Sequence, residues 1–138
     1  MEHGLSKKER ISSLKAIEHL IARGHYVGSG PLRCCWVIRD TGVAETSKVI
    51  VKQGTPVHLN RIVVSVPKKM FRRAVKRNLL KRRIREAYRL QKQLLTGNGV
   101  DLMFVYKSKD IAPYSQISDC VAAILKQISS KLHKNEQI

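Results

Sequence analysis

The chain has 138 residues, enough for one domain with a modest core, since 43% of them are apolar. Its 27 Lys and Arg residues outnumber 10 Asp and Glu residues, and the net charge of +17 predicts a polyanionic partner, nucleic acid or an anionic membrane surface. No apolar run approaches the ~20 residues that span a bilayer, and the amino-terminal residues lack the apolar segment of a secretory signal.

The first part of the chain predicts a helix, a loop and a strand. Residues 6–9 (Ser-Lys-Lys-Glu) have the spacing of a capping box at a helix start, and Gly24 marks the end of that helix. Its apolar stripe consists of Ile11, Leu14, Ile17 and Ile21. Residues 28–31 (Gly-Ser-Gly-Pro) predict a loop, and residues 33–39 a short strand.

The rest of the chain completes a mixed α/β pattern. The elements predicted there are strands at 49–51 and 61–66, a long helix at 71–95, a strand at 101–107 and a helix at 116–132. The order α-β-β-β-α-β-α describes an α/β (α+β) two-layer sandwich with helices packed on a small mixed sheet. We expect a single RNA-binding domain over residues 1–138, with an ordered core of about 5–132.

Three cysteines show neither a disulfide framework nor a metal-binding motif. Cys34 and Cys35 are adjacent and Cys120 is distant, so no CxxC pair is present. We expect buried, reduced thiols in a cytoplasmic protein.

The long helix holds most of the excess charge, because twelve basic residues and one acid lie between Lys68 and Lys92. At 100° per residue, the helix has an apolar arc that must face the sheet, made of Leu80, Ile84, Ala87, Tyr88 and Leu95. A second arc consists of Asn78, Lys81, Arg85, Arg89 and Lys92. Like charges four residues apart destabilise a free helix, whereas contact with phosphates would turn their repulsion into counterion release. Asn78 could hydrogen-bond nucleic acid or fix a neighbouring loop.

Residues 74–88 (AVKRNLLKRRIREAY) resemble the signature of the bacterial ribonuclease P protein subunit, and residues 65–69 are similar to its strand-to-helix approach. The resemblance covers most of the chain. With the basic arc and the approach, it implies RNA contacts by Lys68, Lys69, Arg72, Arg77, Asn78, Lys81, Arg82, Arg85 and Arg89. One position departs from the signature, since Leu79 stands where Arg is usual, and Arg72 and Arg83 could supply the missing charge.

The resemblance also implies a cleft for the 5′ leader of precursor tRNA, lined from the first helix and first strand. Trp36 matches the strand position, while the helix positions are Ile17 and Ile21 rather than aromatic residues. Two readings of Trp36 remain open, a ring that lines the cleft and a core residue under a helix. A left-handed β-α-β crossover is implied as well.

By the same resemblance, the partners are the catalytic ribonuclease P RNA and precursor tRNA, and catalysis belongs to the RNA and its Mg²⁺. The protein itself is expected to hold no metal or cofactor and to be inactive alone, since its carboxylates and histidines form no evident catalytic cluster. A structural RNA-binding protein of the ribosome is the alternative. A DNA-binding helix is disfavoured because the basic helix must also pack on the sheet and no helix-turn-helix spacing precedes it. A membrane-surface helix is disfavoured because it would need a bulky exposed apolar face, which this helix lacks.

Overall fold

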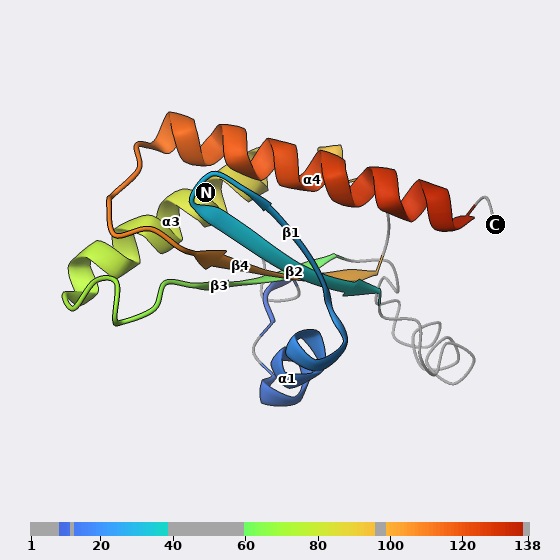
Figure 1. The fold of residues 1–138 in the computed structure, drawn as a ribbon, viewed down its shortest axis with the longest axis horizontal. Helices are drawn as coiled ribbons and strands as arrows, with labels where there is room; N and C mark the ends of the chain where they lie inside the picture. Colours follow the sequence, from blue (N-terminus) through green and yellow to red (C-terminus); the bar gives the residue numbers. More distant parts are fainter. Residues whose placement is uncertain (1–8, 12, 39–59, 96–98, 137–138) are drawn as a thin grey trace.

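The computed structural model describes residues 9–11, 13–38, 60–95 and 99–136 (Figure 1). Its elements are α1 (Leu14–Arg23), β1 (His25–Ser29), β2 (Leu32–Ile38), β3 (Arg61–Ser65), α3 (Ala74–Gln91), the 3₁₀ turn η2 (Lys92–Leu94), β4 (Val100–Tyr106) and α4 (Tyr114–Glu136). The predicted order α-β-β-β-α-β-α and the mixed class of the fold are confirmed.

The four strands form one mixed sheet in the order β1-β2-β4-β3. β1 pairs antiparallel with β2 and β2 with β4, whereas β3 pairs parallel with β4. Parallel neighbours need a crossover connection, which α3 supplies. At the outer edge of β3, Arg10 forms an isolated parallel bridge with Ile62, and the Ile11 amide donates to the Ile62 carbonyl oxygen at 2.8 Å.

The two faces of the sheet are covered differently. α3 and α4 pack on one face, where the main core takes every second residue of three strands: Leu32, Cys34, Trp36, Ile62, Val64, Leu102, Phe104 and Tyr106. α1 packs on the other face over a small cluster built on Ile11, Leu20 and Cys35. Figure 1 shows α4 and α1 on opposite sides of the sheet. Because side chains alternate along a strand, adjacent residues of β2 enter different environments.

β1 is an element that the sequence analysis missed, since residues 25–27 were left unassigned and residues 28–31 were predicted as a loop. Of its side chains only Val27 is buried, so the segment has almost no apolar pattern. Pairing with β2 creates the strand, and Gly30, with φ of 55°, makes the tight turn between them. The strand predicted at 49–51 lies outside the described residues.

The prediction for the first helix was wrong in its start and in its stripe. The helix begins at Leu14, where the Ser13 hydroxyl accepts from the Ala16 amide at 3.3 Å. Leu20 is its buried anchor, whereas Leu14 and Ile21 are 69% and 54% exposed. The helix rests on the sheet along a narrow strip, so Leu14 and Ile21 of the predicted stripe face solvent, whereas Ile17 is partly buried and Ile11 is buried ahead of the helix. Residues 6–8 lie outside the described part of the chain.

Candidate nucleic-acid interface

α3 turns its apolar arc to the core, as the sequence predicts. Leu80, Ile84, Ala87 and Tyr88 are fully buried against the sheet and α4, and Leu95 follows them after η2. Burial raises the pKa of the Tyr88 hydroxyl well above its usual value. The cations of α3 must therefore lie on its flanks and outer side.

One flank of α3 carries the centre of the predicted basic arc. Asn78 and Arg85 are exposed there and Lys81 is half-buried. Arg10, from the segment that bridges to β3, lies close enough that desolvation and its charge together lower the pKa of Arg85. We call Arg10, Asn78, Lys81 and Arg85 the basic stripe. Sequence analysis missed Arg10 because it is far from α3 in the chain.

The later cations of the predicted arc are paired with carboxylates. Arg89 makes a two-pronged ion pair with Glu86, at 3.0 Å from Nε and 2.7 Å from Nη2. Lys92 Nζ lies 2.6 Å from a carboxylate oxygen of Glu9. Among the described residues no carboxylate pairs with Lys81 or Arg85. The positive charge that is left for a ligand is thus concentrated before Glu86, in the first two thirds of α3.

Two arginines of α3 hold loops in place. Arg77 donates from Nη1 to the carbonyl oxygens of Phe71 and Arg72, at 2.8 and 2.7 Å, and so fixes the approach to the helix. Arg83 donates from Nη1 to the carbonyl oxygen of Ala112 at 2.6 Å, and so fixes the loop between β4 and α4. Both were predicted from sequence to offer charge to RNA, and the structure gives them a positioning role.

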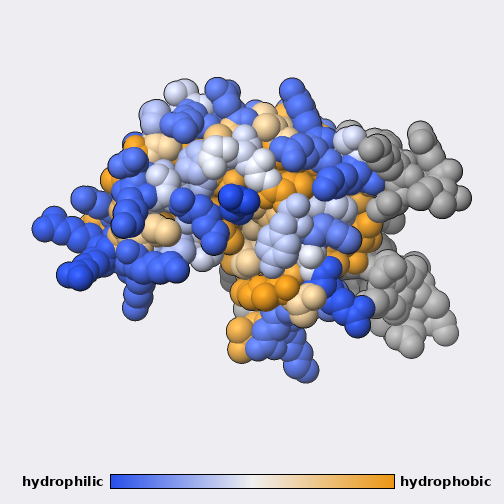
Figure 2. Space-filling model, viewed as in Figure 1, coloured by the Kyte–Doolittle hydropathy of each residue, from blue (hydrophilic) through white to orange (hydrophobic). Residues whose placement is uncertain are grey.

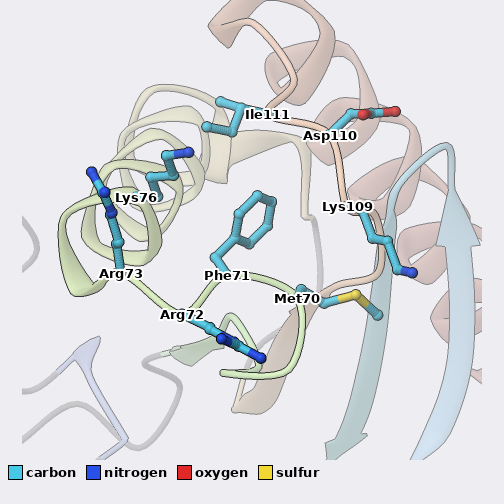
Figure 3. A pocket seen from close by; sticks show the side chains of 8 residues that line it. All are labelled: Met70, Phe71, Arg72, Arg73, Lys76, Lys109, Asp110 and Ile111. Atoms are coloured by element: carbon cyan, nitrogen blue, oxygen red, sulfur yellow. The ribbon is translucent and has the colours of Figure 1, made fainter.

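A second basic surface surrounds a cavity of about 470 Å³ at the start of α3. Arg72, Arg73 and Lys76 lie on the α3 side and Lys109 on the facing loop, with Phe71 between them (Figure 3). Figure 2 shows hydrophilic side chains projecting from this end of the molecule. We call the four cations the basic rim. No acidic residue lies in the first turn of α3 and no side chain caps it, so the helix end adds positive potential.

The remaining predicted residues lie around these surfaces. Lys68 and Lys69 are exposed in the approach to α3, and Arg82 is exposed on its outer side. Leu79 is half-buried, and its neighbour on the helix surface, Arg83, is already bound to the loop after β4. Arg72 and Arg83 were expected to supply the charge that is missing at position 79. Of these two, Arg72 is exposed to solvent.

A groove of about 560 Å³ lies on the sheet face that α1 only partly covers. It is lined by Tyr26, Arg33, Cys35, Met103, Val105 and Lys107. A hydrogen bond with the Cys35 thiol raises the pKa of Tyr26, and burial raises the pKa of Cys35. The floor is apolar, two exposed cations lie around it, and none of these six residues is acidic.

Trp36 does not line this groove. It is 2% exposed in the main core on the opposite face, where its ring lies 4.9 Å from that of His25. The assignment of Trp36 to a cleft beside α1 was wrong, and the core alternative describes it. In α1, Ile17 is half-buried against the sheet, and Ile21 is exposed. Tyr26, which sequence analysis did not single out, is the aromatic residue in the groove.

The thiols of the described residues are not paired with one another. All three cysteines are free and buried, and burial raises the pKa of Cys34 well above its usual value. In the described ranges no group of three or more His, Cys, Asp or Glu side chains could hold a metal ion. None of the helices described there is long and apolar enough to cross a membrane.

Fold and site together define a strongly basic α+β protein whose cations gather around one helix and one open sheet face. Residues 5–129 match the protein family described as Ribonuclease P, and the chain belongs to this family. It is 40% identical over 92 residues to the ribonuclease P protein component of Porphyromonas gingivalis. That alignment covers 67% of this chain and 58% of the relative, so the chain spans less than two thirds of its length.

Two solved structures share the fold. The RNase P protein of Thermotoga maritima has a TM-score of 0.67 and 18% identity, and the match covers 87% of this chain and 97% of that one. A mutant of the Staphylococcus aureus RNase P protein, described as defective in mRNA degradation activity, has a TM-score of 0.67 and 24% identity, with 88% of each chain covered. The resemblance inferred from residues 74–88 is thereby confirmed for family and fold.

Proposed function

We propose that this chain is the protein subunit of ribonuclease P, binding the catalytic RNA and the 5′ leader of precursor tRNA and so promoting endonucleolytic removal of the leader. The observation that carries the proposal is the basic stripe of α3, where Lys81 and Arg85 have no carboxylate partner among the described residues. A like-charge row of this kind is favourable only when phosphates neutralise it.

The catalytic RNA is assigned to α3 and its approach. Lys68, Lys69, Arg72, Asn78, Lys81, Arg82 and Arg85 would contact phosphates and sugars, which position the protein without reading sequence. Arg77 and Arg89 would contribute indirectly, because the first holds the approach loop and the second is paired with Glu86. The basic rim lies on the other flank of α3, so the helix could contact RNA on both sides.

The leader is assigned to the groove beside α1. Its apolar floor and its cations, Arg33 and Lys107, suit an unpaired strand, which offers bases on one side and phosphates on the other. Mature tRNA has no leader to fill the groove. Binding there would therefore raise the affinity for precursor above that for product.

Catalysis is assigned to the RNA subunit with its Mg²⁺, and the protein would bring no catalytic group. Asp110 lines the cavity at the start of α3 and belongs to no group of three possible metal ligands among the described residues. Three other acidic side chains near the proposed surfaces are already engaged: Glu9 pairs with Lys92, Glu86 with Arg89, and Asp101 with Arg61. A carboxylate held in such a pair is poorly placed to act as a base or to bind a metal. We expect the isolated chain to cleave neither precursor tRNA nor single-stranded mRNA, which also tests for the activity ascribed to the S. aureus protein.

Reconstitution tests the proposal directly. The purified chain, added to a bacterial ribonuclease P RNA at low Mg²⁺, should stimulate cleavage of precursor tRNA at the mature 5′ end. Co-purification distinguishes this proposal from the alternative of a ribosomal protein. The chain should co-purify with one structured RNA that has tRNA-processing activity rather than with ribosomal subunits. Absence of stimulation together with recovery on ribosomal subunits would reject the proposal.

A matched pair of variants tests the basic stripe. Lys81→Ala/Arg85→Ala should weaken binding to the catalytic RNA by about ten-fold or more and make its salt dependence shallower by about two phosphate contacts. Lys126→Ala/Lys131→Ala removes the same charge from exposed positions of α4 and should change little. Equal effects of the two double variants would mean that net charge, rather than the stripe, determines binding.

A further inference from the structure

The outer side of α3 begins with apolar side chains. At 100° per residue, Val75 lies opposite the buried arc of the helix, and Leu79 follows it about one turn later. Val75 is 78% exposed and Leu79 is half-buried. Because most of its surface stays in water and valine is a weak helix former, neither packing against the described residues nor helix propensity explains Val75. We call these two residues the outer ridge.

Cations lie on both flanks of the outer ridge. Around the helix, the ridge separates Asn78 and Arg85 of the basic stripe from Lys76 of the basic rim. None of the carboxylates described in the structure pairs with a cation of the basic rim. Asp110 lines the same cavity, and its carboxylate points away from the side chains of α3 in Figure 3. The outer ridge is therefore an apolar strip between two positively charged rows.

The two rows are held in place by hydrogen bonds to neighbouring segments. Arg83 of α3 donates to the Ala112 carbonyl oxygen at 2.6 Å, and the Ala112 amide donates to the Tyr106 hydroxyl oxygen at 2.9 Å. These bonds fix the loop that places Lys109 across the cavity from Lys76 (Figure 3). On the other flank, the backbone bridge to β3 fixes the first residue of the basic stripe.

Two rows of positive charge with an apolar strip between them match one groove of a nucleic-acid helix. Phosphates line both sides of such a groove, and sugars and base edges lie between them. The major groove of an RNA helix is deep and narrow, whereas its minor groove is wide and shallow and is recognised by its shape and its phosphates. An α-helix with its side chains is about 10–12 Å across, so α3 fits the shallow groove rather than the deep one.

We propose that α3 binds a base-paired segment of the catalytic RNA across its minor groove. The outer ridge would contact riboses and base edges, while the basic stripe and the basic rim would contact the phosphates of the two strands. This inference rests on the proposed function; it names the form of RNA that α3 binds and two apolar residues that contact it. Shape and phosphates carry little sequence information, so base pairs of that segment should be exchangeable without loss of affinity.

Binding and footprinting of a bacterial ribonuclease P RNA test the inference. Val75→Ser should lower the affinity for this RNA by about five-fold with an unchanged salt dependence, because an apolar contact releases no counterion. Val75→Ile keeps the apolar contact and should stay within about two-fold of wild type. Lys76→Ala should instead make the salt dependence shallower by about one phosphate contact. Hydroxyl radicals attack riboses exposed in the minor groove, so the wild-type chain should protect both strands of one paired segment.

Two controls separate the possible failures. Leu90→Ser makes the matching change at an exposed apolar residue nearer the end of α3, and should leave RNA affinity unchanged. If the wild-type chain neither binds the RNA nor stimulates cleavage, the proposed function itself fails. If the wild-type chain binds, the inference is overturned by any of three results, while the proposed function stands: Val75→Ser binds as tightly as wild type, Leu90→Ser loses as much affinity as Val75→Ser, or protection falls on unpaired nucleotides alone.

Discussion

Trp36 and Cys35 are neighbours in β2, yet they lie in two very different environments. Trp36 points into the main core beneath α3 and α4, whereas Cys35 forms part of the groove floor beside α1. The covered face takes its large side chains into tight packing. The open face keeps an exposed ring and exposed cations. Along β2, the residues of the covered face therefore stabilise the fold, whereas Arg33 on the open face stays accessible to a ligand.

The largest expected difference between the faces is in stability. Trp36→Ala should lower the free energy of unfolding by ~3–5 kcal/mol, as for other buried large aromatic residues. Tyr26→Ala should lower it by less than about 0.5 kcal/mol, because the ring is exposed. Urea denaturation of both variants measures this. Comparable losses would contradict the division between the two faces.

The open face also contains one buried charge, which sharpens the comparison. Asp101 is 3% exposed and accepts two bonds from Arg61, at 2.9 and 2.7 Å. Arg61→Met should cost about 2 kcal/mol of unfolding free energy, because the buried Asp101 loses the two hydrogen bonds from Arg61, while Arg61 itself is partly exposed.

The companion variant Arg61→Met/Asp101→Leu removes both charges. It should recover most of the loss, since apolar pairs of similar size often replace buried ion pairs without cost. Urea denaturation again gives the values. A double variant as unstable as Arg61→Met would mean that the ion pair itself, rather than the burial of a carboxylate that has lost Arg61, determines stability at this site.

Removing a groove cation should affect binding and leave folding unchanged. Arg33→Ala and Lys107→Ala should each weaken precursor binding by about 0.5–1 kcal/mol, with a shallower salt dependence by about one phosphate contact. Filter binding at several salt concentrations provides the measurement. Lys126→Ala on α4 is the matched control, and an equal loss in that variant would contradict a specific role for the groove.

The smallest effect concerns two adjacent thiols. Burial raises the pKa of Cys34 well above its usual value and raises that of Cys35 less. Both thiols therefore keep their protons in the folded chain, and the stability this provides is present below about pH 8.5 and lost as pH rises further. Between pH 7 and pH 9, the fall in unfolding free energy should be smaller in Cys34→Ala than in wild type, by up to about 1 kcal/mol. In Cys35→Ala the difference from wild type should be smaller still. Identical pH slopes for wild type and both variants in urea denaturation would contradict this order.

Strong local patterns could be predicted from sequence. The apolar arc of α3 follows the helical period over three turns, and its burial is as predicted. The side on which β2 turns Trp36 was not predicted, because apart from Arg33 the strand Leu32–Ile38 is apolar on both faces and a shift of one residue exchanges them. β1 depends on pairing with β2 and has no alternating apolar pattern of its own, so the position of Tyr26 on the sheet could not be predicted.

The electrostatic part of the site was predicted only in outline. Sequence locates the cations on α3 and places Glu86 three residues from Arg89, but the carboxylate that neutralises Lys92 comes from tertiary structure. Glu9 reaches Lys92 from the start of the described chain, and Arg10 joins the basic stripe through its bridge to β3. Neither contact has a signal in the spacing of residues.

The bridge between Arg10 and Ile62 has a consequence for self-association. An uncovered edge strand offers its amides and carbonyls to the sheet of another molecule, a common route to aggregation. Here the outer edge of β3 is partly occupied by the chain's own Arg10–Ile11 segment, and the basic stripe lies alongside it. A second copy approaching edge to edge would meet like charge, so the bridge that places Arg10 in the basic stripe would also oppose the pairing of two copies through this edge.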